Sequence, residues 1–224
     1  AWVAGQISTR ASSDDLSITL GEIKTLNNRQ IVISHITLND PKGPFATLNT
    51  IEIDYSAEHL LMGNMHINRI TIQDIAITRL PEKTDPQQDA TIPKVPNLHI
   101  EAFTVAHLDL APAIMGKQEI LALAGKLVLS SQIKSNDIEL HIEDKNTGNI
   151  LADLIFAPDA DGLNLKASIH DDGQGLLARI TGLPMVNLSI KGTGSMKDWQ
   201  GQLTANTQMK TGAVFETESD LALN

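Results

Sequence analysis

Two stretches of this chain carry apolar residues in pairs that repeat every five positions. A straight β-strand would keep a period of two and an α-helix a period of about 3.6. A period of five needs a two-residue step after each three-residue strand unit. The pairs are Met65 and Ile67, Ile70 and Ile72, and Ile75 and Ile77 in the first stretch, and Leu98 and Ile100, Phe103 and Val105, and Leu108 and Leu110 in the second.

β-Bulges or sharp bends at the polar or small residues between the pairs would return each pair to the same face of a sheet. The positions concerned are Asn68-Arg69, Gln73-Asp74, Ala102 and Ala106-His107. Bends at this frequency curl a sheet, so the rhythm predicts a curved antiparallel sheet with an apolar concave face. The alternative is the strongly twisted edge of an ordinary β-sandwich.

The rest of the chain favours the same all-β class. Alternation of apolar and polar residues predicts strands over 16–20, 30–38, 47–55, 120–130, 136–143, 149–157, 162–170, 186–193 and 200–208, and another from about residue 213. Short helices are expected near 56–63 and over 174–183, the second with an apolar stripe of Leu176, Leu177, Ile180 and Leu183.

The expected organisation is a first β segment over 1–80, a polar, proline-rich loop over 81–96 and a second β segment over 97–224. We expect them to form one continuous unit. Because the chain starts without Met and stops within a strand-like pattern, we expect it to be a piece of a longer protein.

Composition excludes several classes of function. Hydrophobic residues make up 42% of the chain but aromatic residues only 3%, so branched aliphatic side chains must fill the apolar face. The net charge of −10 and the absence of a Lys/Arg cluster argue against nucleic acid and against an anionic membrane surface as partners. With no cysteine, the chain has no thiol nucleophile, disulfide or thiolate metal site.

No residue pattern predicts catalysis, a cofactor or a metal. The seven histidines are scattered without the spacing of metal ligands. Asp159 and Asp161 lack the further acidic positions of a calcium loop, which favours a hairpin turn. Asp171 and Asp172 precede the second helix and are better suited to capping it than to acid–base chemistry. We therefore expect a protein that is not an enzyme.

Several segments resemble the TamB/AsmA-like family of bacterial envelope proteins. The resemblance rests on residues 40–48, 51–56, 59–67 and 175–184, and on Gly192-Thr-Gly-Ser followed by Asp198-Trp-Gln-Gly. Ser195 stands where the family usually has proline, and Tyr55 where tryptophan is common. The resemblance covers about residues 16–207.

The resemblance implies a bent sheet, the β-taco, in a periplasmic protein tethered to the inner membrane by an upstream anchor. It further implies phospholipid acyl chains as cargo moved between the two membranes, and an outer-membrane barrel partner like TamA. An acyl chain needs a dry aliphatic trough without unsatisfied polar groups. Residues expected to line it are Ile67, Ile72, Ile77, Ile100, Val105, Leu110, Leu140, Ile142, Leu165 and Ile190.

Two other interpretations stay open from the sequence. The chain could be a protein-interaction scaffold or chaperone segment for barrel assembly that offers exposed strand edges, or a closed β-sandwich whose apolar face is filled core. In each case the apolar stripe of the helix over 174–183 must be buried against another part of the protein. We expect this helix to lie across the apolar face and to cover one end of it.

Overall fold

The computed structural model describes residues 16–27, 29–56, 58, 65–82, 98–129, 136–147, 149–158, 162–182, 185–195, 198–208 and 214–223. The predicted loop over 81–96 and the predicted helix near 56–63 lie almost entirely outside the described residues.

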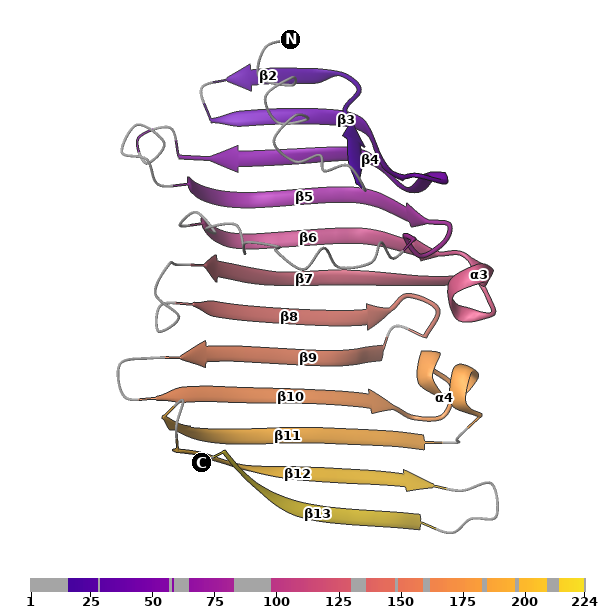
Figure 1. Ribbon diagram of the computed structural model, residues 1–224, viewed down its shortest axis with the longest axis vertical. Helices are drawn as coiled ribbons and strands as arrows, with labels where there is room; N and C mark the ends of the chain where they lie inside the picture. The colour runs from indigo at the N-terminus through magenta and orange to yellow at the C-terminus, as the bar shows by residue number, and fades with distance from the viewer. Residues whose placement is uncertain are drawn as a thin grey trace.

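The described strands form a single sheet that is curved and unclosed, as the sequence predicted. From β3 onward, each strand pairs with the next strand along the chain, so the strands stack in chain order along the longest axis of the molecule (Figure 1). The strands are β1 (Ser17–Thr19), β2 (Ile23–Asn27), β3 (Gln30–Asp40), β4 (Gly43–Tyr55), β5 (Met65–Ile77), β6 (Leu98–Leu110), β7 (Glu119–Leu129), β8 (Asp137–Asp144), β9 (Asn149–Pro158), β10 (Leu163–Asp171), β11 (Met185–Ser195), β12 (Asp198–Gln208) and β13 (Val214–Leu223).

One strand pair in this otherwise antiparallel sheet is parallel. β5 and β6 run in the same direction, with Ile67 beside Ile100, Ile72 beside Val105 and Ile77 beside Leu110. A parallel pair cannot be joined by a tight hairpin, because the chain must return to the side of the sheet where the first strand began. The long connection between Ile77 and Leu98 meets this requirement, and it brings the two five-residue repeats side by side in register.

The bulges predicted from the five-residue rhythm are present in β6. Its partner β7 alternates regularly, and the register between the two strands shifts between Ile100 and Phe103 and again between Val105 and Leu108. Each shift inserts one residue of β6, at the predicted positions near Ala102 and Ala106. The apolar pairs of β6 therefore stay on the same face as every second residue of β7.

β5 uses both a bulge and a shared irregularity. Against β4, its register shifts beside Asn68, as predicted. At Gln73-Asp74 the register is kept. These two residues of β5 and the opposing Asn49 and Thr50 of β4 do not pair with each other, so both strands pass over the same number of residues. The irregularity continues into β3, where His35 has a positive φ of 54° and no partner in β4. The sheet is therefore bent along a line that crosses several strands.

The edge beyond β3 is shared by two short strands. β2 pairs with the first part of β3 and β1 with its last part. They separate at Gly21, where a Cβ atom would lie 2.5 Å from the carbonyl oxygen of Ser34. The sequence did not predict β2, whose Ile23-Lys-Thr-Leu-Asn segment lacks a regular alternation over its full length.

Two short helices lie near the same side of the sheet (Figure 1). α3 (Pro112–Met115) connects β6 to β7, and α4 (Leu176–Thr181) connects β10 to β11. α4 ends at Gly182, whose φ of 72° closes the helix in the left-handed conformation. It is shorter than the predicted 174–183, and Leu183 lies beyond its last residue and outside the described part of the chain.

Candidate apolar binding face

One face of the sheet is aliphatic over nearly all of its described strands. Residues directly opposite each other on neighbouring strands point to the same face, so the register defines rows of side chains that cross the sheet. We call the side that carries these rows the apolar face. One row is Ile33, Ile51, Ile72, Val105, Leu123, Ile142, Ala152, Ile169, Leu188 and Ala205.

All ten residues expected to line a trough lie on this face by register. Ile72, Val105 and Ile142 belong to the row above. Leu140 and Ile190 belong to a neighbouring row, linked through Leu154 and Ala167. A third row holds Ile67, Ile100 and Leu165, linked through Leu127, Ile138 and Phe156, and Ile77 and Leu110 lie side by side near the ends of β5 and β6.

The apolar face is only partly covered. No second sheet lies over it in the described part of the chain. Ile100, Val105 and Leu110 are buried, but the other seven trough residues are half-buried, and Leu188 and Phe215 keep 38% and 55% of their surface exposed. Among the described residues, the face is therefore not the interior of a two-layer sandwich.

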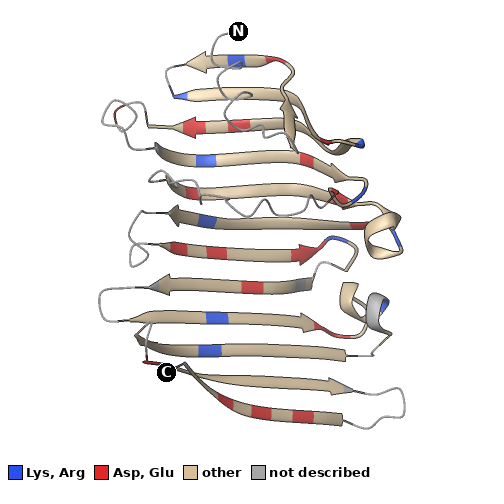
Figure 2. Cartoon of the chain, viewed as in Figure 1, with Lys and Arg blue, Asp and Glu red and all other residues tan. Residues whose placement is uncertain are grey.

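The residues that alternate with the apolar rows point to the opposite face, and they include Lys126, Glu139 and His141. Acidic and basic residues are distributed over many strands of the sheet (Figure 2). Lys126 forms ion pairs with Asp137 and Glu139 on the neighbouring β8. Histidines pair with acids across strands, as in His66 with Glu101 at 2.8 Å and His107 with Asp74 at 3.2 Å. The solvent-side role expected for the histidines fits His107, whose side chain is 51% exposed, better than His66, whose side chain is 18% exposed.

α4 packs on one side of the apolar face. Its Leu176 is buried in a cluster with Leu110, Leu121 and Leu151, and Leu177 packs against the same cluster. Partly buried members of this cluster include Ile77, Leu108, Ile114, Met115 and Ile142. Leu176 and Leu177 of the predicted helix stripe thus contact trough residues; Ile180 lies in the helix, but its side chain is outside the described set.

Four buried carboxylates lie along this same side of the apolar face. The alternation of each strand places its carboxylate on the apolar face, and each carboxylate lies at the end of its strand. We call them the carboxylate border, and the side of the sheet that they mark the α4 side. They are Asp40 (7% exposed), Glu119 (2%), Asp144 (1%) and Asp171 (1%).

Asp40 is held by a two-pronged arginine contact. Arg79, just beyond β5, donates from Nη1 to Oδ2 at 2.5 Å and from Nη2 to Oδ1 at 2.6 Å. The backbone N–H groups of Lys42 and Glu82 donate to the same carboxylate. These hydrogen bonds, that from Arg79 foremost, hold the pKa of Asp40 well below its usual range. The contact ties the β3–β4 turn to the end of β5.

Glu119 and Asp144 share one arginine of α4. Arg179 donates from Nε to Glu119 Oε1 at 2.9 Å and from Nη2 to both Glu119 and Asp144, the latter at 3.0 Å. Asn146 donates to both carboxylates as well, through Nδ2 to Glu119 and through its backbone N–H to Asp144. The hydrogen bond with Glu119, more than that with Asp144, raises the pKa of Arg179, so the guanidinium stays charged.

Asp171 caps α4 from the end of β10. Its Oδ1 accepts the backbone N–H groups of Gly173 and Gly175, and its Oδ2 accepts that of Ala178, each at 2.9 Å. Burial alone would raise the pKa of Asp171, but the backbone hydrogen bonds outweigh burial and hold it below its ordinary value. The capping role expected for this residue is confirmed.

Gly192 and Gly201 lie against one indole ring, that of Trp199. Trp199 is 3% exposed. A Cβ atom at Gly192 would lie 1.9 Å from its ring, and one at Gly201 would lie 2.2 Å from it. Gly192 and Gly201 face each other in register on β11 and β12. The glycines are required because the indole ring occupies the space that side chains would fill.

Sequence reasoning missed Asp40, Glu119 and Asp144 as partners of arginines. Arg179 carried a usable signal, since it is a single cation within the apolar segment Leu176-Leu-Ala-Arg-Ile. A cation on a helix that packs against a sheet needs a buried acceptor. Which acidic residue supplies that acceptor depends on strand register, which the sequence does not reveal.

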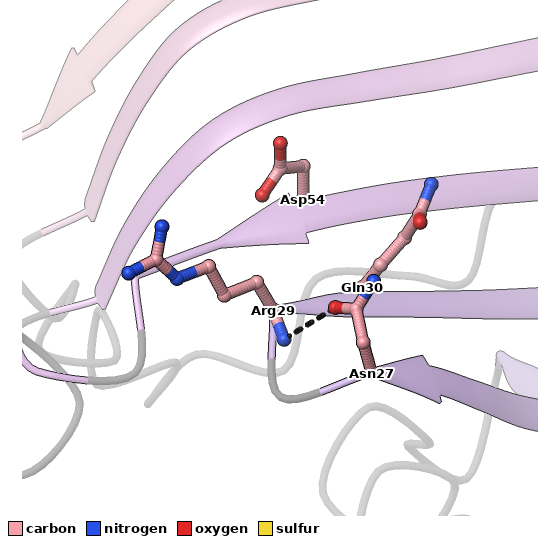
Figure 3. A pocket seen from close by; sticks show the side chains of 4 residues that line it. All are labelled: Asn27, Arg29, Gln30 and Asp54. Atoms are coloured by element: carbon pink, nitrogen blue, oxygen red, sulfur yellow. Dashed lines mark hydrogen bonds between the residues drawn. The ribbon is translucent and has the colours of Figure 1, made fainter.

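A polar pocket of about 520 Å³ lies at the other side of the sheet, lined by Asn27, Arg29, Gln30 and Asp54 (Figure 3). The Arg29 backbone N–H donates to Asn27 Oδ1 at 2.8 Å. The Arg29 side chain is exposed and forms no ion pair with a described carboxylate.

Within the described residues, no group of three or more His, Asp or Glu side chains is arranged to hold a metal ion. None of the helices in that part of the chain has the length and hydropathy needed to cross a bilayer. Comparisons with protein-family models, curated proteins and solved structures found no match to the chain.

Proposed function

We propose that the apolar face binds phospholipid acyl chains, as one segment of a periplasmic protein that moves phospholipid between the inner and outer membranes and supports assembly of outer-membrane proteins. In this proposal the chain is not an enzyme. It works with an inner-membrane anchor and an outer-membrane barrel partner. The resemblance to the TamB/AsmA-like family suggests these partners, and the aliphatic rows support the choice of ligand.

The single observation that carries the proposal is the aliphatic face of an unclosed sheet, with a row of apolar side chains that continues from β3 to β12. Burying an acyl chain against such a face gains about 0.8 kcal/mol for each methylene removed from water. Branched aliphatic side chains provide contact without a fixed geometry, so lipids of different chain length are accommodated. Ile67, Ile72 and Val105 illustrate this, since none presents a polar atom to the face.

Lipid analysis of the purified chain tests the proposal. Native mass spectrometry and solvent extraction are expected to detect co-purified phospholipid. Leu188→Asp places a charge on an exposed part of the apolar face and is expected to release most of that lipid. The matched control is Ser189→Asp, one residue along the same strand but on the polar face. Circular dichroism checks that both variants fold.

Two results would count against lipid binding: an extract of the wild-type chain without phospholipid, or equal lipid content in both variants. If, in addition, crosslinks to unfolded barrel substrates map to strand edges, the chain is a protein-interaction scaffold instead.

A further inference from the structure

We infer that a phospholipid on the apolar face lies with its acyl chains along the strands and their methyl ends toward α4, so that its phosphate lies at the opposite side of the sheet. This inference rests on the proposed function and adds a direction to it. Three features of the α4 side and the opposite side lead to it.

The first feature is the charge of the α4 side. The carboxylate border has four carboxylates and two guanidinium groups, Arg79 and Arg179, in contact with them. Two negative charges are therefore left without a cation. Asp171 has only backbone N–H donors, and Glu119 and Asp144 share one arginine. A lipid phosphate brought to this side would meet like charge in a partly dry environment, where repulsion is stronger than in water.

The second feature is steric. Leu176 and Leu177 of α4 already occupy the apolar face above Leu110, Leu121 and Leu151. A headgroup at this position would have to displace a helix that is held by Arg179 at one point and capped by Asp171 at another. A methyl end has no polar atom that needs water, so it fits against the leucine cluster.

The third feature is the length of the free aliphatic surface. On β7, the apolar-face residues beyond the cluster run from Leu123 to Leu129. At about 3.4 Å per residue they span roughly 20 Å. The hydrocarbon layer of one membrane leaflet is about 15 Å thick, so an acyl chain fits along the strand.

Methyl NMR of the unmodified chain tests the direction. The protein is labelled at isoleucine and leucine methyl groups and mixed with phospholipid that carries a nitroxide either at the methyl end of the acyl chain or next to the glycerol. The methyl-end nitroxide is expected to broaden Leu121 and Ile142 most. The glycerol-side nitroxide is expected to broaden Leu127 and Ile138 most. Each strand supplies its own control, since Ile138 and Ile142 both lie on the apolar face of β8.

The outcomes separate the two proposals. If neither lipid broadens any apolar-face methyl group, the proposed function fails. If both lipids broaden the same methyl groups, or if the pattern is reversed, lipid binding stands and the direction is wrong.

Competition provides a second readout. A saturated fatty acid and the α,ω-dicarboxylic acid of the same length differ only at the end that is placed against the carboxylate border. The dicarboxylic acid is expected to displace bound lipid at least about tenfold less effectively, which corresponds to about 1.4 kcal/mol. Equal displacement would overturn the proposed direction.

Discussion

Arg179 joins helix and sheet on the α4 side, because it is the described cation that reaches both Glu119 and Asp144. Both carboxylates are nearly inaccessible to water, and a buried carboxylate without a partner is costly. The arrangement thus depends on a side chain that cannot be replaced by an apolar one without also changing its acceptors. Residues of this kind are where local sequence reasoning is weakest, since their partners lie far away along the chain.

Replacing Arg179 by alanine is expected to destabilise the fold by about 3 kcal/mol, because it leaves Glu119 and Asp144 buried without their cation. Urea denaturation followed by circular dichroism measures this change. Arg69→Ala, which removes an exposed arginine without a described ion pair, serves as the control and is expected to change stability by less than about 0.5 kcal/mol. Similar losses in the two variants would contradict the role of the buried contact.

The lowered pKa of Asp171 predicts that the stability of the fold depends on pH in the acidic range. Its pKa is lower in the folded chain than the ordinary value of about 3.9 that applies after unfolding. Between these two pKa values, the unfolded state binds the proton first, so stability rises with pH. The contribution is complete above about pH 4 and is lost as the pH falls through the folded-state pKa.

Urea midpoints measured across this acidic range are expected to fall less steeply for Asp171→Asn than for the wild-type chain. The amide keeps one acceptor oxygen but has no acid to titrate. Parallel curves for the two proteins would show that Asp171 does not contribute to acid sensitivity.

At the scale of single elements, the bulged strands were the most predictable feature. The spacing of Ile100, Phe103, Val105 and Leu108 predicted both irregularities of β6, because side-chain direction in a strand has a strict period of two. The boundaries of β7 to β12 also followed from alternation and turn residues. β2 was missed and α4 came out shorter than expected, because short elements leave few repeats from which to judge a period.

Deleting Ala106 is expected to destabilise the chain strongly, by about 3 kcal/mol or more, because Leu108 and Leu110 would turn to the polar face. Thermal or urea unfolding measures the loss. Deleting Gln88, in the polar connection between β5 and β6, is the control, and stability is expected to change little. Tolerance of the Ala106 deletion would mean that the bulge does not set the face of β6.

The hairpin of β11 and β12 offers a separate test of packing. Gly192→Ala places a methyl group where the Trp199 ring lies, and overpacking of this kind costs about 1–3 kcal/mol. The double variant Gly192→Ala with Trp199→Leu is expected to recover part of the loss, since the smaller side chain frees space. A fully stable Gly192→Ala variant would show that the indole ring has room to move.

For the whole molecule, the all-β class and the curvature of the sheet followed from the sequence, whereas the parallel pair did not. Residues 81–96 are polar and rich in proline, a composition typical of a loop that does not specify the direction of the next strand. The trough residues could be predicted to share a face because the alternation of apolar and polar residues identifies the apolar side of each strand. The carboxylate border could not, because it forms only when the strand ends are aligned.

The strand order has a mechanical consequence. From β3 to β13, each strand is hydrogen-bonded to its neighbours along the chain, so tension applied through the chain would load the strand pairs one after another. A single-molecule pulling experiment is expected to show a series of small extension steps rather than one large rupture. The pair of β5 and β6 should resist separation longest. A parallel pair joined by a crossover is loaded closer to shear, so its hydrogen bonds bear the force together, whereas the hydrogen bonds of a hairpin break one after another.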